Sequence, residues 1–205
     1  MSCKRIGIYG GSFSPPHSGH RRAVEAFLAQ EKPDETYIIP ALMPPHKDLQ
    51  GDATAAQRLE MCRLAFAGLP VTVSDMEIRR GGKSYTVLTL EELKKEDCRL
   101  MMLCGTDMFL TLHKWYQPER IFELAEIVYV QRETGENCEA IAAQLARQQR
   151  YLRETYGAVA RPLACDAVMI SSTELRKAIQ NDQSTDAYLA PAVRGYIDTW
   201  KLYRE

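Results

Sequence analysis

The sequence has no long apolar run, no clustered cysteines and no excess of charge of one sign. No segment approaches the ~20 apolar residues of a membrane helix, and the stretch MSCKRIGIYGG lacks the apolar core of a signal peptide. The 26 basic and 27 acidic residues argue against a protein that coats nucleic acid or an anionic membrane. The six scattered cysteines suit reduced thiols. We therefore expect a cytoplasmic protein with no nucleic-acid or membrane partner.

Short apolar runs alternate with helical segments along the chain, which predicts an α/β fold. With 205 residues we expect one domain, 1–205, built as a Rossmann-like, doubly wound, mainly parallel sheet with helices on both faces. The predicted strands are Arg5–Tyr9, Thr36–Ile39, Val71–Ser74, Leu100–Cys104, Ile127–Val130 and Val159–Leu163. The predicted helices are Gly19–Gln30, Ala53–Ala67, Tyr85–Lys95, Glu119–Glu123, Glu139–Tyr156, Thr173–Gln180 and Asp186–Trp200.

Such a sheet also predicts where a ligand binds. In doubly wound sheets the first and fourth strands commonly lie side by side, and ligands bind beyond their carboxyl ends. Here Gly10-Gly11 ends the first strand and Gly105-Thr106-Asp107 follows the fourth. Glycine at both places lets a ligand come close to the backbone, so we expect the site there.

The stretch IYGGSFSPPHSGH, residues 8–20, leaves the first strand without the usual phosphate-loop pattern. It has no third glycine at the dinucleotide spacing and no Gly-Lys-Ser/Thr ending. Pro15 and Pro16 predict a helix that begins near His17 or Ser18, with His17 and His20 on one face. Two imidazoles above free backbone N–H groups at a helix N-terminus favour a polyphosphate ligand.

Two other interpretations of the histidine pair are open. A metal site is disfavoured because only His46 and His113 remain and no cysteine cluster accompanies them, so we expect no protein metal site. Surface histidines at a helix start would be the better interpretation of a bare H-x-x-H pair. The Gly-Gly exit from a first strand favours the phosphate interpretation.

A second informative stretch is MISSTELRKAI, residues 169–179. Ser171, Ser172 or Thr173 can cap a helix, with Glu174 in its first turn, and an ordinary N-cap is the simplest interpretation. A helix start rich in hydroxyl and N–H groups, with Arg176 one turn later, also suits a terminal phosphate. Two such helix starts would hold one triphosphate from both sides.

With these residues in place, the sequence resembles the nucleotidylyltransferase superfamily and, within it, the bacterial nicotinate-mononucleotide adenylyltransferases. The resemblance covers nearly the whole chain and depends on GGSFSPPHSGH (10–20) and ISSTELR (170–176). Shorter matches are Pro44–Lys47, Ser84–Thr86, Gly105–Asp107, His113–Tyr116 and the region from Tyr188 to Tyr203.

The resemblance implies an enzyme that joins nicotinate mononucleotide to the AMP moiety of ATP, forming nicotinate adenine dinucleotide and pyrophosphate in NAD biosynthesis. It implies Mg²⁺ supplied with ATP, which suits a site without an all-protein metal cage. Three alternatives are open: another acceptor, such as nicotinamide mononucleotide or phosphopantetheine; an ATP-binding sensor without turnover; and a zinc-dependent hydrolase. The sequence leaves open whether the chain forms a homo-oligomer.

The resemblance also implies a role for each matching residue. The catalytic residues that contact phosphates would be His17, His20 and Arg176. The other ATP-binding residues would be Gly10, Gly11, Ser12, Phe13, Lys47, Gly105, Asp107, Ile170, Ser171, Ser172 and Thr173. The acceptor would bind at Tyr85, Thr86, Trp115, Tyr116 and Arg132.

The acceptor region permits a physical argument for selectivity. Ser84 reads as an N-cap, so the N–H groups of Tyr85 and Thr86 would lie at a helix start and receive the nicotinate carboxylate. The nicotinamide amide would turn its own NH₂ donor toward them. Trp115 would stack on the pyridine ring, although plain core packing also explains an aromatic pair.

Three positions depart from the family pattern or fit it weakly. Ser14 stands where an acidic residue is common, so any role of that carboxylate in ordering the loop is lost here. Ser12 replaces a common threonine but keeps the hydroxyl. The segment Glu133–Arg153 lacks the arginine-proline-glycine turn expected after the fifth strand, which weakens the assignment of Arg132, and a solvated loop arginine explains that residue equally well.

Overall fold

The computed structural model describes residues 3–45, 53–131, 138–165 and 170–204. Within them, six strands form one sheet in the order β3-β2-β1-β4-β5-β6, and every neighbouring pair is parallel. The strands are β1 (Lys4–Gly11), β2 (Glu35–Pro40), β3 (Thr72–Val73), β4 (Cys98–Cys104), β5 (Ala125–Gln131) and β6 (Ala160–Ala164). The predicted Rossmann-like α/β fold is confirmed, including the pairing of β1 with β4.

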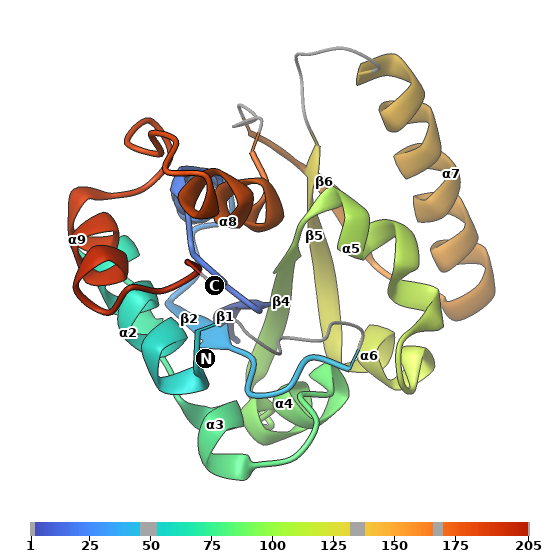
Figure 1. Ribbon diagram of the computed structural model, residues 1–205. Coiled ribbons are helices and arrows are strands. Elements are labelled where there is room, and N and C mark those ends of the chain that lie inside the picture. The colour runs from blue at the N-terminus through green and yellow to red at the C-terminus, as the bar shows by residue number, and fades with distance from the viewer. Residues whose placement is uncertain (1–2, 46–52, 132–137, 166–169, 205) are drawn as a thin grey trace.

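Helices cover both faces of the sheet, as predicted. They are α1 (Ser18–Glu31), α2 (Ala55–Ala65), α3 (Met76–Arg80), α4 (Thr86–Leu93), α5 (Thr106–Thr111), the short 3₁₀ helix η1 (Leu112–Lys114), α6 (Pro118–Leu124), α7 (Cys138–Tyr156), α8 (Ser172–Gln180) and α9 (Pro191–Thr199). Helices α2, α8 and α9 lie on one side of the sheet, and α5, α6 and α7 on the other (Figure 1). None of the helices in the described ranges is long and apolar enough to cross a membrane.

Each face of the sheet has its own hydrophobic core, because successive side chains of a strand point to opposite faces. Met101 and Leu103 of β4 pack in the core under α1, α2, α8 and α9. Leu100, Met102 and Cys104 pack in the core under α4, α5, α6 and α7. This double burial explains why the strands appear in the sequence as continuous apolar runs.

A glycine in β1 sets how closely α1 approaches the sheet. A Cβ atom added at Gly7 would lie 2.5 Å from Cε1 of Phe27 and 3.0 Å from Oγ1 of Thr36. Phe27 is fully buried in α1. Glycine is therefore required here for α1, which carries the two histidines at its N-terminus, to pack on β1.

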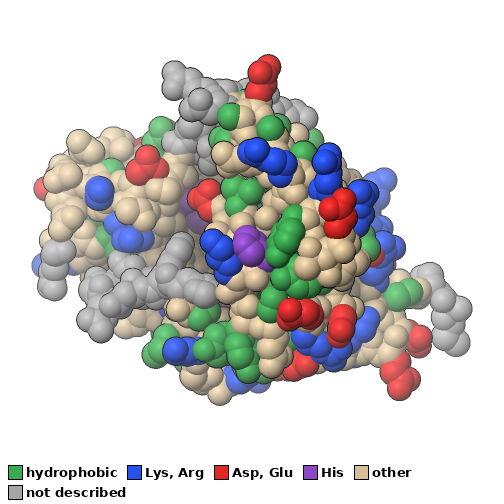
Figure 2. Space-filling view, turned by 90° about the vertical axis from the view of Figure 1, so that its right-hand side faces the viewer, with side chains coloured by type: hydrophobic (Ala, Val, Ile, Leu, Met, Phe, Trp, Pro, Cys, Tyr) green, Lys and Arg blue, Asp and Glu red, His purple; other side chains and the backbone are tan. Residues whose placement is uncertain are grey.

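The outer face over α5, α6 and α7 has a mixed surface. Basic, acidic and apolar side chains are interspersed on it (Figure 2). Two exposed aromatic residues belong to this side of the molecule, Tyr116 after η1 and Tyr151 in α7. Neither positive nor negative side chains dominate this face.

Some predicted boundaries were wrong for local reasons. The helix predicted over Asp186–Trp200 begins only at Pro191, because the N–H groups of Tyr188 and Leu189 both donate to the carbonyl of Thr185 in a preceding turn. Proline is well suited to the first helical position. Helices α3 and α5 were not predicted, because they have only five and six residues and so give little periodicity.

Candidate active site

The carboxyl ends of β1 and β4 lie side by side and carry the expected glycines. β1 ends at Gly10 and Gly11, and Gly105 follows β4 as the N-cap of α5. The carbonyl of Gly11 accepts a hydrogen bond from the N–H of Ala41, 2.9 Å away, which ties this edge to the segment after β2. A Cβ atom at Gly105 would meet nothing within 4 Å, so the backbone there is open to a ligand.

His17 and His20 lie together at the N-terminus of α1, as predicted. His17 is the N-cap, and the two ring centroids are 3.8 Å apart. Nδ1 of His17 accepts from the N–H of Gly19, and Nδ1 of His20 accepts from the N–H of His17, each at 3.2 Å. Because an accepting Nδ1 carries no proton, these bonds assign the proton of each neutral ring to Nε2.

The expectation of free backbone N–H groups at the start of α1 was wrong for two of them. The N–H of Ser18 donates to the carbonyl of Tyr188 at 2.8 Å, and that of Gly19 donates to His17. These two groups are therefore not free for a phosphate, since the chain satisfies them itself. The imidazole Nε2–H groups take their place as the expected donors.

The protonation of His17 follows from its surroundings. His17 is only 8% exposed, and this burial lowers its pKa to about 4. The neutral ring is also the form that caps the helix, because a protonated Nδ1 could not accept from Gly19. At neutral pH, His17 therefore presents a neutral hydrogen-bond donor.

Phe13 has a packing role that the sequence did not suggest. Its side chain is 1% exposed and contacts the rings of Tyr9, His20 and Phe66 edge-on, with centroid distances of 5.4, 5.1 and 6.0 Å. Its backbone has φ 47°, in the left-handed region. Phe13 thus anchors the loop and supports His20, and only its backbone is placed to line a ligand site.

The second predicted helix start lies against the first. Ser171 caps α8 in a capping box with Glu174, as predicted. The Ser172 hydroxyl donates to the carbonyl of Pro15 at 3.0 Å, and Nη1 of Arg176 donates to the carbonyl of Ser14 at 2.8 Å. Within the described residues, the N–H groups of Ser172 and Thr173 have no acceptor.

Ser14 is held by two hydrogen bonds although it lacks a carboxylate. Its side chain is 1% exposed, and its hydroxyl is hydrogen-bonded to the hydroxyl of Tyr203 at 3.1 Å. Its carbonyl accepts from Arg176. The loop before α1 is therefore ordered by a neutral hydrogen bond where an acidic residue is common.

The expected N-cap role of Ser84 was wrong. Helix α4 begins at Thr86 with Tyr85 as its N-cap, and the Ser84 hydroxyl instead accepts from the N–H groups of Leu42 and Met43. The N–H of Tyr85 donates to the carbonyl of Lys83 at 3.0 Å. Of the two N–H groups predicted to bind a carboxylate, only that of Thr86 lacks an acceptor within the described residues.

The predicted aromatic residues lie next to this turn. The rings of Tyr85 and Tyr116 are 4.5 Å apart between centroids, at 37° between planes. Tyr116 is 50% exposed, whereas Trp115 is partly buried against the core under α4 to α7. The site face thus offers a tyrosine pair, and Trp115 combines packing with partial exposure.

Other predicted residues are placed with less detail. Asp107 is exposed in the first turn of α5, and Ile170 packs against the core under α8. Lys47 and Arg132, like His46, lie outside the described residues. In the described ranges, no three His, Cys, Asp or Glu side chains come together as a metal site.

Arg58 is a site residue that sequence reasoning missed. It lies in α2 with 1% exposure, and its guanidinium donates to the carbonyls of Ser12 (2.8 Å), Leu42 (3.1 Å) and Ala53 (3.3 Å). It thereby joins the first loop to the segment after β2. Its local sequence reads as a polar helix position, so only long-range contacts reveal it.

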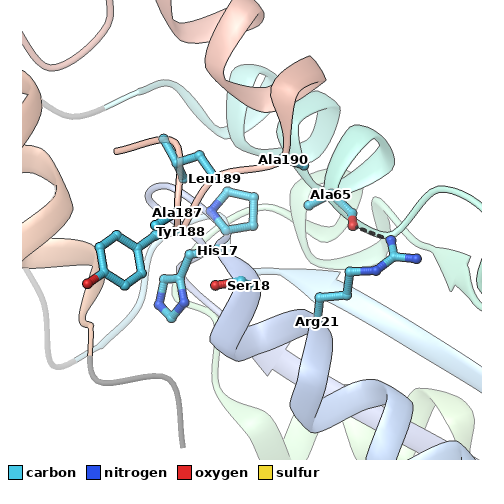
Figure 3. Close-up of a pocket in the computed structure, with 9 residues that line it drawn as sticks. His17, Ser18, Arg21, Ala65, Ala187, Tyr188, Leu189 and Ala190 are labelled. Carbon is cyan, nitrogen blue, oxygen red and sulfur yellow. Dashed lines mark hydrogen bonds between the residues drawn. The ribbon is translucent and has the colours of Figure 1, made fainter. Parts of the chain in front are cut away.

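A small hollow flanks the N-terminus of α1 on the side of α2. It is lined by Pro16, His17, Ser18, Arg21, Ala65 and the segment 187–190. Arg21 closes one end by donating to the carbonyl of Ala65 at 2.8 Å (Figure 3). It also donates to the carbonyl of Ala67 at 3.0 Å. The walls are mostly apolar, and the hollow opens beside the imidazole of His17.

Comparison with known proteins shows the family of the chain. Residues 8–178 match the family model described as cytidylyltransferase-like. Proteins named "Probable nicotinate-nucleotide adenylyltransferase" from Desulfatibacillum aliphaticivorans and Citrifermentans bemidjiense are each 38% identical to this chain. The alignments cover 97% of it and 99% and 98% of those proteins.

Solved structures show the same fold at low identity. The Plasmodium falciparum nicotinic acid mononucleotide adenylyltransferase complexed with NaAD has a TM-score of 0.74 at 18% identity, covering 98% of this chain and 97% of that one. The same protein complexed with APC has a TM-score of 0.72 at 17% identity, with the same coverage. By the family model and the full-length relatives, the chain belongs to the cytidylyltransferase-like nucleotidyltransferases and, among them, to the nicotinate-nucleotide adenylyltransferases.

Proposed function

We propose that the enzyme transfers the adenylyl group of ATP to nicotinate mononucleotide. A phosphate oxygen of the mononucleotide attacks the α-phosphorus in line, a new P–O–P bond forms, and the bond to the β-phosphate breaks with its electron pair leaving on pyrophosphate. The attacking phosphate is already largely ionised near neutral pH, since the second pKa of phosphate monoesters is ~6. No general base is needed, and catalysis is positioning and charge stabilisation.

The observation that carries this proposal is the contact between the two helix starts. Arg176 and Ser172 of α8 are held against Ser14 and Pro15, directly before the histidines of α1. A chain of three phosphates between them meets donors from both sides. In this arrangement His17 and His20 donate from Nε2 to phosphate oxygens, and these bonds strengthen as charge develops.

The remaining nucleotide contacts follow the edge of the sheet. The backbone of Gly10, Gly11 and Ser12 lines the phosphates, and the N–H groups of Ser172 and Thr173 face the β- and γ-phosphates with Arg176. Gly105 and Asp107 hold a ribose, with the Asp107 carboxylate accepting from a hydroxyl. Ile170 and Ser171 border the adenine. Lys47 and Arg132 stay predictions for the phosphates.

The acceptor binds at the start of α4. The N–H of Thr86 lacks an acceptor among the described residues, and we assign it to the nicotinate carboxylate, whereas the N–H of Tyr85 donates to the carbonyl of Lys83. Tyr116 and Trp115 flank the pyridine ring. A nicotinamide group could offer only its neutral carbonyl oxygen to this N–H, whereas the carboxylate accepts a stronger, charge-assisted hydrogen bond, which favours the nicotinate form.

The reaction calls for a divalent cation, and we propose Mg²⁺ bound with ATP. The side-chain groups that the structure brings together at the two helix starts include imidazole, guanidinium and hydroxyl groups, which suit donation to phosphate oxygens. This suits Mg²⁺, which is commonly held by substrate phosphates and waters and needs no all-protein cage. Bound there, the cation would neutralise phosphate charge.

The cytoplasm stays the predicted location of the enzyme.

Pyrophosphate release tests the proposal. Purified enzyme is given ATP and Mg²⁺ with nicotinate mononucleotide, nicotinamide mononucleotide or phosphopantetheine in parallel, and a matched series contains excess chelator. We expect strong release with the nicotinate form that chelator abolishes. Equal release with both pyridine nucleotides would refute the selectivity at Thr86, and release with none would favour an ATP sensor without turnover.

A further inference from the structure

The segment that follows β2, residues 41–43, is hydrogen-bonded to both of the places assigned to the substrates. Ala41 is 7% exposed and Met43 is 54% exposed, so side-chain burial is lost along the segment. Its backbone groups are held by hydrogen bonds on both sides. The position of the segment therefore depends on its hydrogen-bond partners.

One side of the segment is tied to the loop that lines the phosphates. The N–H of Ala41 donates to the carbonyl of Gly11 at 2.9 Å. Arg58 adds a second connection, because its Nη1 donates to the carbonyl of Ser12 at 2.8 Å and its Nη2 to the carbonyl of Leu42 at 3.1 Å. The guanidinium is rigid and planar and Arg58 is 1% exposed, so the two carbonyls are held at a fixed spacing.

The other side of the segment is tied to the turn that precedes α4. The Ser84 hydroxyl accepts from the N–H groups of Leu42 and Met43 at 2.9 and 3.4 Å. The N–H of Ser84 in turn donates to the carbonyl of Met43 at 2.9 Å. Thr86, whose N–H we assign to the nicotinate carboxylate, follows two residues later in the chain. The place of this N–H thus depends on how Ser84 is held.

Leu42 carries both connections in one residue. Its N–H donates to Ser84, and its carbonyl accepts from Arg58. A ligand that fixes the loop at Ser12 therefore also fixes Arg58 and Leu42, and through them the turn at Ser84. A second ligand then binds to a turn that is already in place and loses less conformational entropy.

We propose that residues 41–43 couple the binding of ATP to the binding of the acceptor, with Arg58 and Ser84 as the positioning residues at the two ends. The inference rests on the proposed function, which places the phosphates of ATP at the first loop and the acceptor at the start of α4. Neither residue touches a substrate, and each acts through the backbone of Leu42. ATP bound at one end increases the affinity for the acceptor at the other.

Two dissociation constants for nicotinate mononucleotide measure this coupling. They are obtained by titration calorimetry with Mg²⁺, without and with a saturating ATP analogue that has a methylene group between its α- and β-phosphates. The coupling ratio is the first constant divided by the second. Direct contacts between the two bound ligands contribute alike in every variant, so a difference between variants isolates the contribution of residues 41–43.

The substitution Ser84→Ala removes the oxygen that accepts from Leu42 and Met43. We expect its coupling ratio to fall about threefold to tenfold below that of the wild type, the magnitude of one lost hydrogen bond. Arg58→Lys replaces two separate donors by one ammonium group and is expected to lower the ratio in the same way. In the double variant the two losses are expected not to multiply, because either change alone already breaks the connection.

Ser74→Ala is the matched control. The Ser74 hydroxyl accepts from the N–H of Met76 at 3.3 Å in the turn before α3, so the same atom is removed and a backbone N–H loses its acceptor in a different turn. We expect this variant to melt at a lower temperature and to keep the wild-type coupling ratio. A purely structural role of Ser84 would give the same result in Ser84→Ala.

Each outcome leads to a separate conclusion. A coupling ratio of Ser84→Ala that equals or exceeds that of the wild type overturns the inference, while pyrophosphate release by the wild type leaves the proposed function standing. If Ser84→Ala does not fold, the ratio of Arg58→Lys decides in the same way. Losses that multiply in the double variant would show two independent roles and would also overturn the inference. A wild-type enzyme that releases no pyrophosphate with nicotinate mononucleotide refutes the proposed function, and the inference with it.

Discussion

His17 combines two tasks in one ring, and substitution can separate them. Nδ1 accepts from the N–H of Gly19 and caps α1, while Nε2 carries the proton assigned to a phosphate. In His17→Asn the side-chain oxygen takes the place of Nδ1, and no donor remains at Nε2. In His17→Gln the amide nitrogen reaches toward the place of Nε2, and the cap is lost.

The two variants are therefore expected to fail in opposite ways. A lost N-cap costs about 1 kcal/mol, which lowers the melting temperature of a domain of this size by about 2 to 4 °C. A lost donor to developing charge lowers kcat by about 100- to 1000-fold. We expect His17→Asn to melt as the wild type and lose kcat by that factor. His17→Gln is expected to melt lower and keep more of its turnover.

Melting followed by circular dichroism and kcat from pyrophosphate release at saturating substrate provide the two measurements. His17→Ala is the control that lacks both groups and is expected to show both losses. Near-normal turnover of His17→Asn would refute the role given to Nε2. A low melting temperature in His17→Asn with normal melting in His17→Gln would refute the assignment of the ring proton.

Two further predictions concern the buried charges and rings of the site. The pKa of His17 is about 4 in the folded protein, against an ordinary value of 6.5, so the unfolded chain binds more protons between these two pH values. As the pH falls from 6.5 to 4, we therefore expect the free energy of unfolding to decrease by about 3 kcal/mol, as measured by urea unfolding. In His17→Asn this decrease is expected to be smaller. Arg58→Met leaves three carbonyls without their donor. We expect it to lower the free energy of unfolding by about 3 to 5 kcal/mol and to raise the KM for ATP. A free energy of unfolding equal to that of the wild type would show that Arg58 does not support these loops.

Features with local causes could be predicted from the sequence. The Pro-Pro-His start of α1 and the Ser171-Glu174 capping box of α8 depend on residues within one turn, and the structure has both. The alternation of apolar runs and helical segments is also a local pattern, and it was enough to predict the parallel sheet and the place where its strand order reverses. Short helices such as α3 and α5 have too few residues for a period to appear.

Features that depend on distant partners could not. Ser84 and Ser171 give the same capping signal, but the hydroxyl of Ser84 is taken by Leu42 and Met43, some 40 residues away. The N–H of Ser18 donates to the carbonyl of Tyr188, and no local sequence pattern predicts this bond. Arg58 looks like an ordinary polar helix residue until three carbonyls from two loops meet it.

The place of β1 in the middle of the sheet has a consequence for biosynthesis. Its partner β2 follows closely in the chain, but β4, which pairs with its other edge, follows about 90 residues later. A ribosome adding about 5 to 20 residues per second leaves that edge open for about 5 to 20 s. Ile6 and Ile8 pack in the same core as Leu100 and Met102 of β4, so this core is incomplete until β4 has been made. The emerging chain thus passes through a stage in which the histidine half of its site has been made and an apolar strand edge awaits its neighbour, the kind of surface that chaperones shield.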